Sequence, residues 1–214
     1  MYRINCRNVN SCLVEHANEK STRMNISLAA ADAILARTLH VLNNGDRSLL
    51  GALDELPAPI YVTDADGVIT YYNPACIAFA GRVPSLGRDR WCVTWKLYTE
   101  DGAFLPHDKC PMADAILTQT PVRGISALAE RPDGTRLNFV PFPTPLFDAQ
   151  GRFIGAVNML IDVTASKRAV VLREQARRCR RLAVSVDDDQ TTSTLNGLAT
   201  DYEEEARKLS SSEA

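Results

Sequence analysis

The chain has 214 residues, of which 45% are hydrophobic and 23% charged, and its formal net charge is -2. This length and composition fit one globular domain with flanking helices. The charge argues against nucleic-acid binding, because affinity for phosphates depends on an excess of Lys and Arg. No stretch reaches the roughly 18 apolar residues that span a bilayer, and no signal leader opens the chain. We therefore expect a cytoplasmic protein without a membrane anchor.

Six cysteines are scattered along the chain without a paired framework, which favours a reducing compartment over a disulfide scaffold. They are Cys6, Cys12, Cys76, Cys92, Cys110 and Cys179.

The first part of the chain predicts a flexible leader and then a helix. Residues 1–24 are polar and have no apolar period, and Met24 could serve as an alternative start of translation. Residues 25–49 predict an amphipathic helix, which ends near Asn43-Asn44-Gly45. Its apolar positions are Leu28, Ala31, Ile34, Leu35, Leu39 and Leu42. Because this face has no partner in its own segment, we expect it to pack across a homodimer interface.

A sheet is predicted from β-rich segments separated by tight turns. Asp66-Gly67, Asp133-Gly134 and Gln150-Gly151 each lie between two such segments, where glycine supplies the positive φ of a hairpin turn. The expected strands are 60–63, 68–72, 124–130, 136–146 and 153–162. Prolines at 141, 143 and 145 recur with a period of two, so the fourth strand is kinked or lies at an edge in its second half.

Short helices are predicted between the second and third strands. Asn73-Pro74 breaks a strand and starts a helix over 74–80, since Asn favours the N-cap and Pro the first helical position. A second helix is expected at 111–118. Residues 81–105 between them read as an irregular stretch.

This order of turns, strands and helices resembles that of the PAS sensor domain, and the resemblance covers roughly Leu50 to Ala165. It implies an α+β fold, with a curved antiparallel five-stranded sheet, short helices on one face, and flanking helices at both ends. PAS domains of this kind enclose a small apolar cavity between sheet and helices. The residues that we expect to line a ligand site are Ile69, Trp91, Trp95, Ile116, Leu117, Phe139, Val157 and Met159. The same residues would also form a dry, filled core.

A second resemblance concerns Arg90-Trp-Cys-Val-Thr-Trp and His107-Asp-Lys-Cys-Pro-Met-Ala. It is to a bacterial PAS subset with a tryptophan-cysteine stretch followed by this His-Asp-x-Cys-Pro-Met-Ala run. His107 and Cys110 could share a metal or a haem iron, and Cys110-Pro111 looks like the dipeptide of haem-regulated proteins. Alternatively, Asp108 caps the helix and Cys110 is a small buried hydrophobe.

The sequence contains no motif for flavin photochemistry or for catalysis. The Asn-Cys-Arg-Phe-Leu-Gln run of light-oxygen-voltage domains is missing, which argues against flavin. There is no phosphate loop, nucleophile elbow or catalytic carboxylate pair, so we expect no enzyme activity.

The C-terminal segment, 166–214, predicts two charged helices. The first is basic with an apolar stripe, the second carries Glu203-Glu204-Glu205, and the two could pair as a hairpin or between subunits. Asp162-Val163-Thr164 corresponds to the Asp-Ile-Thr signature that closes PAS domains. We expect Thr164 to cap the outgoing helix and Asp162 to bind a group in the sheet, so that the pair couples the sensor to the helices.

The sequence therefore predicts a bacterial stand-alone PAS signalling protein that senses a small molecule or binds a protein partner. One alternative is a haem- or metal-binding redox or gas sensor that uses His107 and Cys110. Another is a dimerisation adaptor with an empty, packed core.

Overall fold

The computed structural model describes residues 53–211 of the chain. The predicted leader (1–24) and the predicted amphipathic helix (25–49) lie outside the described residues.

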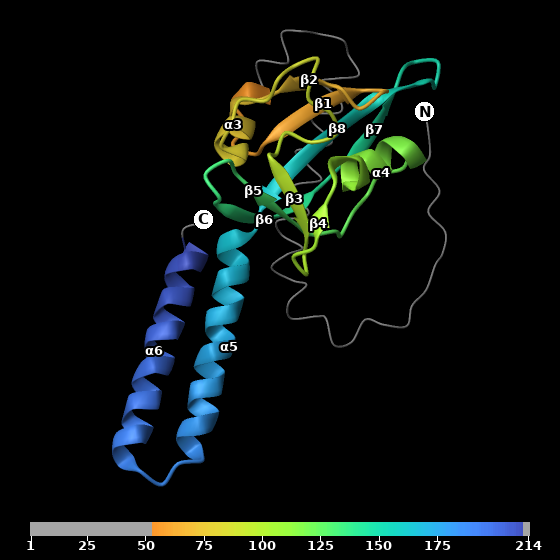
Figure 1. The fold of residues 1–214 in the computed structure, drawn as a ribbon. Coiled ribbons are helices and arrows are strands. Elements are labelled where there is room, and N and C mark those ends of the chain that lie inside the picture. Colours follow the sequence, from red (N-terminus) through yellow and green to blue (C-terminus); the bar gives the residue numbers. More distant parts are fainter. Residues whose placement is uncertain (1–52, 212–214) are drawn as a thin grey trace. The chain divides into compact units, whose positions relative to one another are not determined.

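An antiparallel sheet forms the core of the described part (Figure 1). Its strands run in the order β2-β1-β8-β6-β5-β3-β4, and β7 also pairs with β8. The strands are β1 (Ile60–Asp64), β2 (Ile69–Tyr72), β3 (Lys96–Thr99), β4 (Phe104–Leu105), β5 (Ala127–Glu130), β6 (Arg136–Pro141), β7 (Thr144–Phe147) and β8 (Phe153–Asp162). The ten-residue strand β8 lies between β1 and both β6 and β7, so it connects the two halves of the sheet.

The predicted class and the antiparallel sheet are confirmed, but the count of five strands is wrong. The stretch 81–105, which the sequence indicated as irregular, contains the hairpin of β3 and β4. Its turn is Asp101-Gly102, where Gly102 has a φ of 89° and donates a hydrogen bond to the Thr99 carbonyl over 2.9 Å. This is the same turn signal that marked the other hairpins.

The prolines divide one predicted strand into β6 and β7. The break falls at Phe142-Pro143, and β7 then pairs only with β8 in the described part. Proline has no amide hydrogen, so the proline side of this segment cannot continue the ladder with β5. The predicted kink is confirmed.

Short helices pack on one face of the sheet, which we call the inner face. They are α3 (Pro74–Ala80), the 3-10 turn η2 (His107–Lys109) and α4 (Pro111–Thr118). Side chains of α3 and α4 share one buried cluster with Tyr61 and Leu160 of the sheet. The bounds predicted for both helices are confirmed, but the cap at Asp108 is wrong, because Cys110 precedes the first turn of α4 and makes no side-chain cap bond.

Asn73 fixes the start of α3 in a different way from the one expected. It occupies the N-cap position, but its side chain makes no cap hydrogen bond. Its Oδ1 accepts from the Ile60 amide over 2.9 Å, and its Nδ2 donates to the carbonyls of Leu53, Leu56 and Ala58 over 2.9 to 3.3 Å. The fully buried amide therefore fastens the segment before β1 to the end of β2.

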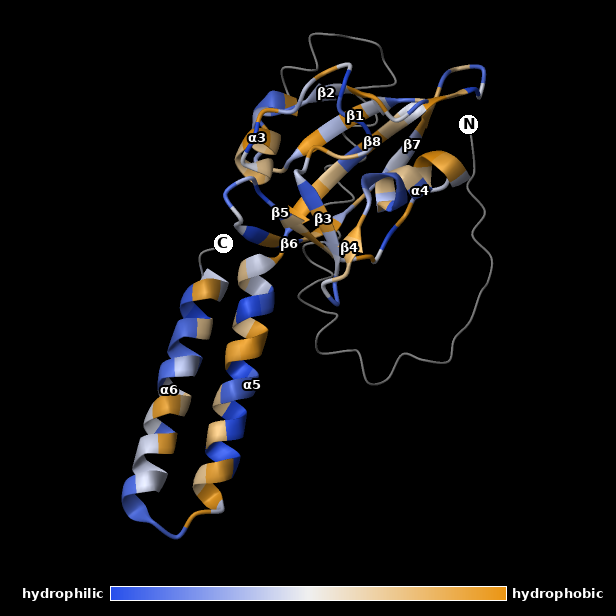
Figure 2. Cartoon of the chain, viewed as in Figure 1, coloured by the Kyte–Doolittle hydropathy of each residue, from blue (hydrophilic) through white to orange (hydrophobic). Residues whose placement is uncertain are grey.

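The C-terminal helices α5 (Thr164–Val184) and α6 (Asp189–Ser211) pair with each other as a hairpin. Leu172 and Ala206 pack in a small cluster with Tyr202 and Leu209. Many hydrophilic residues remain on both helices (Figure 2). No helix within residues 53–211 is long and apolar enough to cross a membrane.

Gly155 allows β8 to lie close to β1. Its φ is +145°, and a Cβ atom built at this position would be 2.0 Å from the Thr63 carbonyl oxygen. Any larger residue must therefore push the two central strands apart.

We expect Gly155→Ala to lower the free energy of unfolding by at least about 2 kcal/mol, since it combines backbone strain with a clash against backbone. Gly151→Ala is the matched control, because Gly151 also has a positive φ (+76°) but nothing lies within 4 Å of its added Cβ. The control should lose only about 1 kcal/mol. Urea denaturation measures both, and equal losses would contradict the role given to the β1–β8 contact.

Candidate functional site

A chain of hydrogen bonds crosses the inner core around Tyr61. The buried Tyr61 hydroxyl donates to the Trp91 carbonyl oxygen over 2.9 Å and accepts from Asn158 Nδ2 over 2.9 Å. Asn158 Oδ1 in turn accepts from the Phe142 amide over 2.9 Å. These bonds join β1, β8, the break between β6 and β7, and the loop before β3. Buried polar groups that are satisfied in this way hold their elements in one arrangement.

The loop reaches the core through a tight turn at Trp91. Trp91 has a φ of 70°, and the Cys92 amide donates to the Arg90 carbonyl over 2.8 Å, which is the geometry of the rarer and more strained γ-turn. The Trp91 amide donates to the Gly67 carbonyl over 2.8 Å, and the indole lies where a Gly67 side chain would be. The turn therefore directs the Trp91 carbonyl toward Tyr61.

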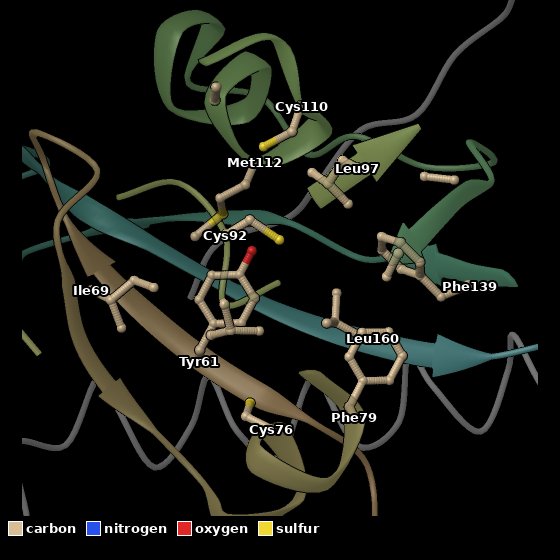
Figure 3. Close-up of a cluster of buried hydrophobic side chains, with 14 of the residues drawn as sticks. Tyr61, Ile69, Cys76, Phe79, Cys92, Leu97, Cys110, Met112, Phe139 and Leu160 are labelled. Atoms are coloured by element: carbon tan, nitrogen blue, oxygen red, sulfur yellow. The ribbon is translucent and has the colours of Figure 1, made fainter. Parts of the chain in front are cut away.

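Sulfur-containing side chains gather beside the Tyr61 hydroxyl (Figure 3). Thr94 Oγ1 donates to Cys92 Sγ over 3.2 Å and lies 3.4 Å from His107 Nε2. Cys110 points into the same cluster from the start of α4, and Met112 reaches it from the first turn of that helix. We call Tyr61, Cys92, Cys110 and Met112 the inner cluster.

Burial keeps the groups of this region uncharged at neutral pH. It raises the pKa of Tyr61 well above its usual value, and the neighbouring Cys92 and Cys110 raise it further. Burial, with a smaller contribution from Cys92, raises the pKa of Cys110 to about 12. It lowers the pKa of His107, with Arg82 acting in the same direction. Tyr61, Cys110 and His107 therefore act as neutral donors and acceptors.

Four residues of the predicted ligand set lie in or against the buried core of the inner face. Ile69, Ile116 and Phe139 belong to the buried core of the inner face, and Trp91 packs against it. Phe139 makes an edge-to-face contact with Phe79 of α3, with ring centroids 5.4 Å apart.

Val157 and Met159 were assigned to the wrong face of the sheet. Val157 pairs with Val62 and Met159 with Ile60, whereas Tyr61 pairs with Asn158. Because directly paired residues share a face and successive residues alternate, Val157 and Met159 point away from Tyr61. Both are fully buried on the other face.

Trp95 and Leu117 also lie elsewhere. Trp95 is 51% exposed and Leu117 is 83% exposed, so neither belongs to the buried core. Leu117 follows the buried Ile116 directly, and neighbouring residues on a helix point about 100° apart.

His107 and Cys110 have different surroundings. Cys110 is buried in the inner cluster, whereas His107 contacts Thr94. Within residues 53–211 no group of three or more His, Cys, Asp and Glu side chains could hold a metal ion. These two side chains alone do not complete a zinc site.

Sequence reasoning missed Tyr61 and Asn158. The signal for Asn158 was present, since it is the only amide in the apolar run 153–161. An amide inside such a run needs a hydrogen-bond partner in the core. The partner is 97 positions away in the sequence, and local patterns cannot identify it.

The closing residues Asp162 and Thr164 exchange the roles that we expected. Asp162 Oδ1 accepts from the Thr164 amide over 2.8 Å, so the acid stabilises the start of α5. The Thr164 hydroxyl accepts from the Asn138 amide over 2.8 Å and donates to the Asn138 carbonyl over 3.4 Å. The hydroxyl, and not the carboxylate, therefore binds the sheet.

Comparison with known proteins places the central part of the chain in one family. The sequence model of a family described as the PAS fold matches residues 53–168, which is more than half of the chain. No curated protein matches the sequence.

Similar solved structures include the PAS domain of the fruit-fly ELK potassium channel, with 12% identity, a TM-score of 0.45, and coverage of 55% of this chain and 95% of that one. A PAS domain from Colwellia psychrerythraea has 18% identity and a TM-score of 0.38, covering 55% and 96%. An RNA-binding light-oxygen-voltage receptor has 23% identity and a TM-score of 0.42, covering 54% of this chain. The chain spans only 32% of that receptor's length.

We expect Tyr61→Phe to destabilise the protein by about 1–3 kcal/mol, because the buried Asn158 Nδ2 and Trp91 carbonyl oxygen both lose the hydroxyl as a hydrogen-bond partner. Tyr71→Phe is the control, since its hydroxyl donates to Asp54 at an exposed position, over 2.7 Å. The control should lose about 1 kcal/mol or less. Thermal denaturation compares the stability of the two variants. An equal loss in both would show that the inner hydrogen bonds stabilise the fold no more than an exposed one does.

Proposed function

The chain belongs to the PAS family, and we propose that it is a non-enzymatic signalling protein whose PAS domain acts on its C-terminal helices. In this proposal the inner core senses a small molecule, and the hairpin of α5 and α6 presents the response to another protein. The observation that carries the proposal is the contact of Thr164 with Asn138.

The Thr164 contact links the start of α5 to the backbone of the inner core. The neighbours of Asn138 in β6, Leu137 and Phe139, are both buried in the core of the inner face. The Asn138 carbonyl also accepts from the Val163 amide over 2.8 Å. A change in the inner core that shifts β6 would therefore move the groups that hold the first turn of α5.

The hairpin is suited to move as one body. Arg180 binds Glu203 through two hydrogen bonds of 2.8 and 3.0 Å, and Arg168 binds Glu205 over 2.7 Å. Such exposed ion pairs are individually weak, but they lie along a packed apolar seam. A change in the direction of α5 would thus be carried to α6.

Assembly and location belong to the same proposal. We propose a homodimer and a protein partner, with the exposed faces of α5 and α6 as the contact surface. A cytoplasmic location is supported by the free thiols of the four described cysteines, which suit a reducing compartment.

A second candidate, a dimerisation adaptor with a packed core, is favoured by one observation. Every buried side-chain nitrogen and oxygen within the described residues already has a hydrogen-bond partner. Native mass spectrometry of the isolated chain separates the two candidates. A retained small molecule supports sensing, whereas a mass equal to the protein alone supports the adaptor.

We expect Thr164→Val to quicken hydrogen exchange in α5, from about residue 167 to 182, while β8 stays protected. The lost hydrogen bonds leave the Asn138 amide unpaired, at a cost of about 1–3 kcal/mol. Asp162→Ala should have a smaller effect, of about 1 kcal/mol, because it removes only a helix-start contact. Thr200→Val, which changes an exposed hydroxyl on α6, should leave α5 unchanged. Equal acceleration in α5 and β8 would make Thr164 a stability residue and remove the support for coupling.

A further inference from the structure

Three sulfur side chains meet at the centre of the inner core. Cys92, Cys110 and Met112 are each no more than 4% exposed and belong to one buried cluster. Figure 3 shows the Cys92 thiol and the Met112 thioether beside the Tyr61 hydroxyl, with the Cys110 thiol directed toward them. The two cysteines are also close enough to act on each other's charge and on that of Tyr61.

The sulfur atoms are the groups of this core with unused binding capacity. Each buried nitrogen and oxygen atom of the described side chains already has a hydrogen-bond partner, so none of them needs a polar ligand. A thiol sulfur that accepts one hydrogen bond, as Cys92 does from Thr94, can still bind a metal ion after losing its proton. This core therefore suits a ligand that binds preferentially to sulfur.

From this arrangement we propose that Cys92, Cys110 and Met112 bind one Cu(I) ion in the inner core. Thiolate and thioether ligands select Cu(I), which accepts two or three soft ligands. Zinc would need four ligands, whereas the described residues offer no group of three His, Cys, Asp or Glu side chains. This inference rests on the proposed sensing function and gives it a ligand.

The binding step releases protons and involves no redox change. Cu(I) displaces one proton from each thiol, forms two Cu–S bonds to the thiolates and takes the Met112 thioether as a third donor. The product carries one negative charge, and the Thr94 hydroxyl already donates to one of the two sulfurs. Because thiol protons leave on binding, the apparent affinity should rise with pH.

The site is placed where binding can change the hydrogen bonds that hold the core. Tyr61 lies in the inner cluster and connects through Asn158 to the Phe142 amide, at the break between β6 and β7. A metal that draws Cys92 and Cys110 together pulls on the Trp91 turn and the start of α4. The same ion would then act on β6 and, through Asn138, on Thr164.

The test is an anaerobic titration of the full chain with Cu(I), in competition with bicinchoninate. Cys6, Cys12 and Cys179 are first replaced by serine, so that only the three buried cysteines remain. We expect one Cu(I) per chain. Cys92→Ser or Cys110→Ser should each weaken binding by about a hundredfold or more, and Met112→Leu by about tenfold.

Cys76→Ser is the matched control. Cys76 is also buried, but its Sγ lies 3.3 Å from the Ile60 carbonyl oxygen, and Figure 3 shows it across the Tyr61 ring from Cys92, Cys110 and Met112. Circular dichroism confirms that each variant is folded, and Cys92→Ala provides a second, smaller change if the serine variant unfolds. Unchanged Cu(I) binding in both cysteine variants, or the same loss in the Cys76 control, overturns the site. If Thr164→Val speeds hydrogen exchange in α5 but the chain binds no Cu(I), the proposed function stands and only the ion is rejected.

Discussion

The hydrogen bond between Asn158 and Tyr61 is the interaction on which the rest of this PAS domain depends. It joins the two central strands inside an apolar core, where an unpaired amide or hydroxyl would be costly. Both groups have a second partner, at Phe142 and Trp91, so the position of one strand fixes the kink of β6 and β7 and the strained turn before Cys92. The inner cluster is a consequence of this arrangement, because the turn places Cys92 beside Tyr61.

The connection from β8 to α5 also depends on backbone groups that are paired by hydrogen bonds. Asn138 uses its amide and its carbonyl to hold Thr164 and Val163, and its neighbours Leu137 and Phe139 fill the inner core. Strand alternation thus places core side chains and the helix anchor on one short segment. This segment therefore links the core of the PAS domain to the start of α5.

Local signals in the sequence predict much of the fold. The Asp-Gly turns, Asn73-Pro74 and the alternating prolines each specify a backbone conformation, and the structure has those turns, the start of α3 and the strand break. The faces of β8 could not be predicted in the same way. Residues 155–160 are buried on both sides, so an unbroken apolar run does not show which side chains face the helices. The partner of Asn158 and the meeting of Cys92 with Cys110 depend on pairings distant in sequence.

The central position of β8 also sets an order of events during synthesis. β1 pairs with β2 through a short local turn, but its other edge pairs with β8, whose Asn158 follows Tyr61 by 97 residues. At ribosomal rates that interval lasts about 5 to 20 s, during which this edge of β1 has no strand to pair with. The hairpin of α5 and α6 is made of local contacts and can close as soon as it emerges. The sheet is therefore the part of the nascent chain that waits longest in an aggregation-prone state.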